Sequence, residues 1–253
     1  MRLTPLMLLA AGLAAALPAA PILIRPDRDD AEYLELATRY PSGIALSASE
    51  GGEGVLIAPR WILASARRAQ ALQDLKPLPR VRIGEVDYAI ENVFIHPEWK
   101  KASFNDVALV LLRKGVTGVT PTLLYRDSDE GGKAVAVVGH GRSGKMGAAS
   151  TDWDRKSRAA INTVDRVEPR TLELRLKPLD DASDLQGAAT PTDVGAPAFT
   201  EAAAGIFVAG IYSESSGERE AYARVSAFVP WIEAVMLDVA KREMDSLLDP
   251  DRR

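Results

Sequence analysis

The chain has 253 residues, of which 47% are hydrophobic and 26% charged, and its formal net charge at pH 7 is −4. This length can bury a sizeable core, as one large all-β domain or two small ones. The acidic balance gives no electrostatic reason to expect nucleic acid or an anionic membrane as partner. The absence of cysteine excludes a cysteine nucleophile and thiolate metal ligands, and two histidines are too few for a histidine-rich metal site. We therefore expect no cofactor and no metal.

The first residues have the layout of a secretory signal peptide. Arg2 gives a positive start, an apolar run covers residues 6–17, and small residues follow through Ala20. The run is shorter than the roughly 20 residues that a membrane-spanning helix needs. A buried N-terminal helix or a retained anchor is the alternative interpretation. We expect residues 1–20 to be a signal peptide, no membrane span after its cleavage, and a secreted or periplasmic protein.

The remaining chain is predicted to be mostly strands. Residues 27–40 are polar with interspersed apolar positions, which fits a short helix ending near Pro41. From Gly43 onward, short β-type runs alternate with turns, at 44–48, 54–58, 61–64, 81–83, 88–95 and 107–112, and again at 134–138, 160–164, 172–176, 198–199, 207–212 and 221–225. Six runs on each side of a polar linker at 125–133 predict two barrels.

A C-terminal helix follows the predicted strands. Ser226 is its expected N-cap, apolar residues recur at helical spacing up to Val239, and the charged residues after Glu243 are expected to fray. The predicted organisation is an N-terminal segment at 21–42, a double-barrel domain with its helix at 43–243, and a flexible tail at 244–253.

Three blocks carry the chemical signal. Residues 52–67 form an apolar stretch ending in Ala-Ser-Ala-Arg, residues 104–112 contain Asn-Asp-Val-Ala-Leu, and residues 189–199 form a turn of small residues around Asp193 and Val194. The series resembles the trypsin-like, chymotrypsin-fold serine proteases, in uninterrupted order over roughly residues 41–232. The resemblance implies an all-β fold of two six-stranded antiparallel β-barrels with a C-terminal α-helix.

The catalytic triad of that family is broken at two of its three positions. By resemblance, Arg67 stands where the family has its general-base histidine, Asp106 where it has the orienting aspartate, and Val194 where it has the nucleophilic serine. A guanidinium is always charged and cannot accept a proton, and valine has no oxygen for attack. In a related enzyme, removing either nucleophile or base alone costs about 10⁶-fold in rate. We expect no competent catalytic residue.

The rest of the family's site also departs from the pattern. Thr192 and Val194 stand at the oxyanion-hole positions, and because Thr192 replaces a glycine we expect a distorted hole. The positions of the specificity pocket hold larger or different side chains than in the family, so we expect a shallow or closed pocket without preference for a basic side chain; these are Ala188, Ser213, Glu214, Ser215 and Glu220.

Two carboxylates have predicted structural roles. We expect Arg67 to reach Asp106 in a short, partly buried, bidentate ion pair; the alternative is an Asp106 that only caps local backbone N–H groups. Asp193 matches the family aspartate that receives a new N-terminal ammonium after cleavage, and the nearest candidate for such a terminus lies around Ile22. We expect instead a turn carboxylate bound to local N–H groups.

The glycine-rich stretch at residues 139–146 and the two histidines admit other interpretations. Residues 139–146 fit G-x-G-x-x-G and nearly fit a phosphate-binding loop, but Met146 lacks the required hydroxyl and no βαβ alternation surrounds them, which favours a glycine-rich barrel turn. His140 is expected to be structural and His96 to lie at a surface or turn. The favoured function is an exported, inactive protease homologue that binds a protein or peptide. The alternatives are a serine-type endopeptidase with weak or unconventional activity, and a purely structural exported scaffold.

Overall fold

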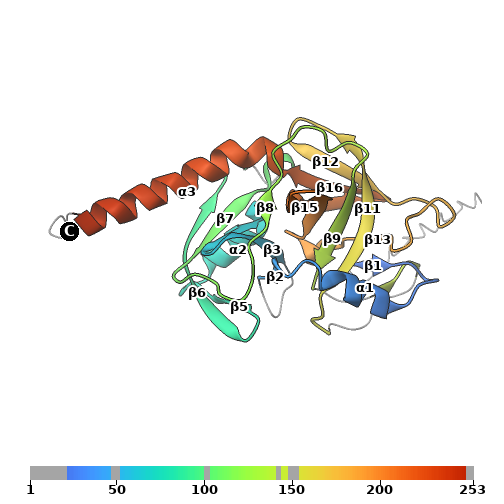
Figure 1. Ribbon diagram of the computed structural model, residues 1–253, viewed down its shortest axis with the longest axis horizontal. Helices are drawn as coiled ribbons and strands as arrows, with labels where there is room; N and C mark the ends of the chain where they lie inside the picture. Colours follow the sequence, from blue (N-terminus) through green and yellow to red (C-terminus); the bar gives the residue numbers. More distant parts are fainter. Residues whose placement is uncertain (1–21, 47–51, 100–102, 141–143, 148–153, 249–253) are drawn as a thin grey trace, which may run out of the picture.

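The computed structural model describes residues 22–46, 52–99, 103–140, 144–147 and 154–248, and its main feature is a pair of β-barrels (Figure 1). The first sheet has the order β2-β3-β4-β7-β6-β5. Its strands are β2 (Gly43–Ala45), β3 (Glu53–Ala58), β4 (Trp61–Ala64), β5 (Arg80–Ile83), β6 (Val86–Ile95) and β7 (Ala108–Leu112). Successive strands pair antiparallel, and no backbone pairing joins the end strands β2 and β5 among the described residues. The first barrel is therefore nearly closed.

The second barrel closes completely. Its strands are β9 (Ala134–Gly139), β11 (Arg158–Val167), β12 (Thr171–Arg175), β14 (Pro197–Ala202), β15 (Gly205–Ser216) and β16 (Arg219–Arg224). They run in the order β14-β9-β11-β12-β16-β15, and β14 pairs with β15 to complete the ring. The short strand β8 (Leu123–Leu124) joins β15 in parallel. Each predicted run overlaps one strand of a barrel, so the predicted double-barrel fold is confirmed.

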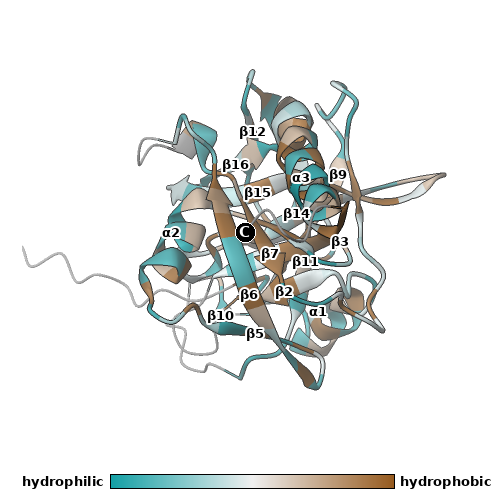
Figure 2. Cartoon of the chain, turned by 90° about the vertical axis from the view of Figure 1, so that its left-hand side faces the viewer, coloured by the Kyte–Doolittle hydropathy of each residue, from teal (hydrophilic) through white to brown (hydrophobic). Residues whose placement is uncertain are grey.

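Three apolar clusters hold this arrangement together. One fills the first barrel, with Leu56, Ile62 and Val110 among its members, and one fills the second, with Val137, Leu172 and Ala209. The third lies between the barrels, where residues of β3, β4 and β7 meet residues of β9, β14 and β15. Figure 2 shows long hydrophobic segments along the barrel strands, as expected for strands that line a core.

The final helix, α3 (Val225–Leu248), seals the third cluster and then extends away from the barrels (Figure 1). Phe228 and Ile232 are buried in the cluster, whereas the residues beyond Val239 are largely exposed. The predicted N-cap of this helix is wrong. The helix begins at Val225, so Ser226 lies inside it and donates its hydroxyl to Glu130. The helix continues through Leu248, and residues 249–253 of the predicted tail lie outside the described residues.

The N-terminal segment belongs to the body of the fold. Strand β1 (Leu23–Ile24) pairs in parallel with β10 (Gly144–Lys145) and antiparallel with β13 (Gly187–Ala188). Helix α1 (Asp30–Ala37), which confirms the predicted short helix, starts at a capping box formed by Asp29 and Glu32. Arg158 of β11 binds the Asp30 carboxylate with two nitrogens, at 2.6 and 2.7 Å. The segment therefore stays attached to the second barrel.

Candidate functional site

The first half of the site is the start of helix α2 (Ala66–Asp74), which the sequence analysis did not predict. Ser65 is its N-cap, and its hydroxyl accepts the backbone N–H of Arg68 at 3.1 Å. Arg67 therefore lies in the first helical turn, where backbone N–H groups have no partner inside the helix. The buried Asp106 supplies one, since its Oδ1 accepts the backbone N–H of Arg67 at 2.7 Å.

The predicted ion pair between Arg67 and the buried Asp106 is present, but it is long, at 3.9 Å, rather than short and bidentate. A guanidinium nitrogen of Arg67 lies 3.9 Å from Asp106 Oδ2 and 3.9 Å from a carboxylate oxygen of Glu214, and the Arg67 side chain is 47% exposed. The arginine thus bridges loosely from the first barrel to β15 of the second. Asp106 also binds the helix start through the Arg67 N–H, so the backbone cap of the alternative interpretation is present beside the long ion pair.

The Asp106 carboxyl has a defined electrostatic setting. Burial raises its pKa above the ordinary value, while the backbone N–H of Arg67, the charge of Arg67 and the Ser213 side chain oppose that rise. A helix N-terminus also stabilises negative charge. The arrangement therefore provides an anchored Asp106 carboxylate. No imidazole lies between it and the turn that carries Val194, which forms the other half of the cleft between the barrels.

The second half is the turn that carries Val194. The 3₁₀ helix η2 (Pro191–Asp193) is capped by Thr190, and Val194 follows it. Two backbone hydrogen bonds, both 2.9 Å, fasten this turn to the first barrel, from Gly52 N–H to the Thr192 carbonyl and from Glu53 N–H to the Val194 carbonyl. The turn and the start of α2 therefore face each other across the barrel interface.

Gly195 is the residue that lets the two halves approach. Its φ is +95°, and a Cβ built on it would lie 2.1 Å from the Glu53 carbonyl oxygen and 3.4 Å from the Ser65 nitrogen. Only a glycine accepts both the left-handed backbone and this contact. The same contact places the residue after Val194 next to the N-cap of α2, and hence near Arg67.

The turn does not present a pair of free N–H groups of the kind that bind an oxyanion. The Thr192 N–H is directed at its neighbour, the Thr190 hydroxyl, at 3.4 Å. The Asp193 and Gly195 N–H groups donate to the carbonyls of Thr190 and Tyr212, at 2.8 and 2.9 Å. Because an oxyanion hole needs donors aimed at one empty point, this arrangement lacks one of the two donors at the positions expected from the sequence.

Asp193 is buried beneath this turn. Its Oδ2 accepts the Thr190 backbone N–H at 2.9 Å and the Thr190 hydroxyl at 3.0 Å. Its Oδ1 has no hydrogen-bond partner among the described residues and faces Gly139 beside Ile22. Burial, with the nearby charge of Glu53, raises the pKa of Asp193 to about 8. The carboxyl thus lies beside the segment that the sequence offers as the nearest candidate for a new N-terminus.

The residues at the pocket positions fall into two groups. Ala188, Ser213 and Glu220 are buried, while Glu214 and Ser215 are exposed. Glu220 Oε1 accepts the Ala189 backbone N–H at 2.5 Å, so this carboxyl group occupies the wall beside Ala188. Burial raises the pKa of Glu220 to about 8, and the charge of Asp193 adds to that rise. None of these five residues lines the larger cavity identified among the described residues.

A buried Glu53–His140 pair was missed by the sequence analysis. Glu53 is 1% exposed, one of its oxygens accepts the His140 backbone N–H at 2.9 Å, and the other lies 2.7 Å from His140 Nδ1. Desolvation opposes the charge on His140, but the attraction of Glu53 outweighs it and raises the histidine pKa. The available signal was a lone carboxylate in the apolar strand that follows Gly52.

His96 and the glycine-rich stretch at residues 139–146 are two further features that the sequence singled out. His96 begins a turn, in which the Trp99 N–H donates to its carbonyl at 2.9 Å, so the turn alternative of its prediction is confirmed; its side chain is 8% exposed and packs edge-on against Phe228 and Trp231 of α3. Burial lowers the His96 pKa. In the glycine-rich stretch, residues 141–143 lie outside the described residues, while Gly139 ends β9 and Gly144 begins β10.

The fold and the site geometry define a double-β-barrel protein of the chymotrypsin type. Residues 37–232 match the family model described as Trypsin, which covers more than half of the chain. The chain therefore belongs to the trypsin family. No curated protein sequence matches it closely enough to be counted as a relative.

The described residues offer neither a metal-binding cluster nor a membrane-spanning helix. Among the described ranges, no group of three or more His, Cys, Asp or Glu side chains is arranged to hold a metal ion. In the same part of the chain, no helix combines the length and the apolar character that crossing a membrane requires.

Proposed function

We propose that this member of the trypsin family is an exported, proteolytically inactive homologue that binds a protein or peptide. The proposal rests on one observation: at the interface between the barrels, the first turn of α2 carries a guanidinium and the facing turn carries an isopropyl group. A proton acceptor and an attacking oxygen are both needed for acyl transfer by a triad. Arg67 and Val194 supply neither.

The surroundings of these residues support the proposal. The Thr192 N–H turns to Thr190, and Glu220 fills the wall beside Ala188. A substrate carbonyl would therefore lack one oxyanion donor, and a substrate side chain would meet an occupied wall. Binding to the exposed loops of the cleft needs neither feature. Export is proposed from the apolar run at residues 6–17 and the small residues after it.

The test is labelling with a serine-directed fluorophosphonate, with casein cleavage measured in parallel. We expect the wild-type chain to give neither labelling nor cleavage. The matched positive control is the triple variant Arg67→His, Val194→Ser, Thr192→Gly, which restores a base, a nucleophile and a small residue at the hole. Labelling of the wild type that persists after Val194→Ala and Arg67→Ala would overturn the proposal in favour of an unconventional hydrolase.

A further inference from the structure

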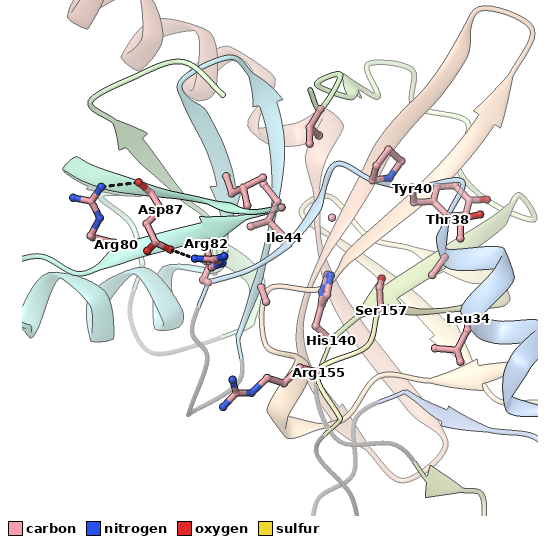
Figure 3. Close-up of a pocket in the computed structure, with 18 residues that line it drawn as sticks. Leu34, Thr38, Tyr40, Ile44, Arg80, Arg82, Asp87, His140, Arg155 and Ser157 are labelled. Atoms are coloured by element: carbon pink, nitrogen blue, oxygen red, sulfur yellow. Dashed lines mark hydrogen bonds and ion pairs between the residues drawn. The ribbon is translucent and has the colours of Figure 1, made fainter. Parts of the chain in front are cut away.

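The described residues enclose a groove of about 870 Å³, whose lining includes none of Arg67, Asp106 and Val194; Figure 3 shows residues that line it. We call it the seam groove and define it by Leu34 of α1, Ile44 of β2, Arg80 and Arg82 of β5, and His140 and Arg155 of the second barrel. Its volume falls within the roughly 300–1,000 Å³ typical of ligand sites. The groove follows the seam where the first barrel is not closed.

Both strands that border the seam have backbone groups that no neighbouring strand pairs. In β2, the Ser42 carbonyl and the Leu46 N–H bond to the β3 side, so by alternation Gly43 and Ala45 direct their polar groups away from β3, although the Gly43 N–H donates to the Tyr40 carbonyl at 3.1 Å. In β5, the Pro79 carbonyl accepts the Ile90 N–H, so Arg80 and Arg82 direct theirs away from β6. Unpaired strand edges of this kind bind extended peptides.

Most of the groove is lined by apolar residues, and its charged side chains are three arginines and one carboxylate, Asp87. Arg80 and Arg82 are two residues apart on β5 and project from the same face. Arg80 donates to the neutral backbone carbonyl of Asp87 at 2.6 Å, and Arg82 is shared between Glu85 and Asp87 at 3.1 and 3.5 Å.

The opposite side of the groove adds positive charge. The His140 ring points into the groove, anchored by the buried Glu53, and no described residue bonds to its Nε2. Arg155, also on the rim, has no ion-pair partner among the described residues. A locally positive groove in a chain of net charge −4 favours an anionic ligand.

We propose that the seam groove binds an extended peptide with carboxylates at alternate positions, as an antiparallel strand beside β5. Residues directly opposite Arg80 and Arg82 would exchange backbone hydrogen bonds with them and face their guanidinium groups, so these residues are acidic. The residues between them point to the barrel side, next to Val81 and Ile83, so they are apolar. The ligand class is thus an acidic–apolar–acidic strand.

This inference builds on the proposed function, because it names the class of peptide and its place on the protein. The two fail separately, since fluorophosphonate labelling reports on the cleft and peptide affinity reports on the groove. The probe is a fluorescein-labelled hexapeptide in which glutamate and valine alternate, titrated with the full chain and followed by fluorescence anisotropy. A peptide of the same composition with its glutamates contiguous is the first control.

We expect the alternating peptide to bind at least ~10-fold more tightly than the contiguous one, and Arg80→Ala with Arg82→Ala to weaken it at least ~10-fold. The matched control is Arg166→Ala with Arg175→Ala, which removes two exposed arginines from β11 and β12 and should leave affinity within about twofold. Thermal melts of both double variants should overlay the wild type because all four side chains are exposed.

Backbone methylation separates strand pairing from simple charge attraction. N-methylation of the glutamates removes the donors that face β5 and should abolish binding, whereas N-methylation of the valines should be tolerated. Equal binding of the alternating and contiguous peptides, equal binding of the two methylated peptides, or unchanged affinity in Arg80→Ala with Arg82→Ala would each overturn the proposal. So would an absence of detectable binding at ~1 mM peptide, a level at which an affinity of only about −4 kcal/mol is measurable.

Discussion

Buried carboxyl groups have different hydrogen-bond donors and charged neighbours in the two halves of the cleft, which are the start of α2 and the turn that carries Val194. Asp106 of the first barrel and Asp193 and Glu220 of the second are each 2% exposed or less. Asp106 accepts a 2.7 Å backbone bond at a helix start and lies 3.9 Å from a guanidinium. Burial instead raises the pKa of both Asp193 and Glu220 to about 8, with the charge of Glu53 adding to the rise at Asp193 and the charge of Asp193 adding to the rise at Glu220. Burial alone therefore does not set the state of a carboxyl group here; its donors and charged neighbours do.

The difference also tells what each half contributes to the fold. The Asp106 carboxylate stabilises α2, because it satisfies backbone groups that the helix leaves open. The second-barrel carboxyls are most stable when protonated, so they oppose the fold as the pH rises. The halves meet at the backbone bonds that Gly52 and Glu53 make with the turn.

The largest expected effect comes from forcing the halves apart with Gly195→Ala. The new Cβ would lie 2.1 Å from the Glu53 carbonyl oxygen on a backbone with φ of +95°. Strain and overpacking together should lower the free energy of unfolding by about 4 kcal/mol. Urea unfolding followed by circular dichroism measures it.

Gly217→Ala is the matched control for this change. Gly217 has a φ of +62° and no neighbouring atom within 4 Å of a built Cβ, so only the left-handed backbone contributes. Its cost should be about 1 kcal/mol. Equal losses for the two variants would mean that the contact between turn and first barrel contributes nothing.

The second-largest expected effect is the loss of stability in Asp106→Ala. It separates the contribution of the Arg67 backbone N–H bond from that of the ion pair with the Arg67 guanidinium. Asp106→Ala leaves the Arg67 N–H without its acceptor and should cost about 2–3 kcal/mol, which lowers the melting temperature by roughly 8 °C. Asp106→Asn retains an acceptor oxygen and should cost much less. Arg67→Ala removes only contacts of 3.9 Å from a half-exposed side chain, so it should cost under about 1 kcal/mol. Melting curves in which Arg67→Ala matches Asp106→Ala would restore the ion-pair interpretation.

These residues also show which parts of the fold and of the site could be predicted from the sequence and which could not. Short apolar runs predicted the barrel strands because each strand lies within one contiguous stretch. The helix at Ala66–Asp74 was missed, since its apolar side is limited to small alanines and Leu72. Without that helix, no pattern favoured the backbone donors over the guanidinium, so backbone binding by Asp106 was only the alternative prediction. The seam groove depends on how β2 lies relative to β5, which no local pattern encodes.

The smallest expected effect concerns pH and Glu220. Its folded pKa of about 8 exceeds the ordinary 4.5, so the folded chain holds a proton that the unfolded chain has lost between these values. Stability should therefore fall as the pH rises from about 5 to 8, and Asp193, with the same sign of shift, adds to the fall. Glu220→Gln keeps the carbonyl acceptor for Ala189 without ionising. Its melting temperature should exceed that of the wild type at pH 8 by roughly 3 °C, equivalent to about 1 kcal/mol, and the difference should shrink at pH 5. A difference independent of pH would mean that Glu220 does not titrate in this range, and the contrast between the two halves of the cleft would then rest on Asp193 alone.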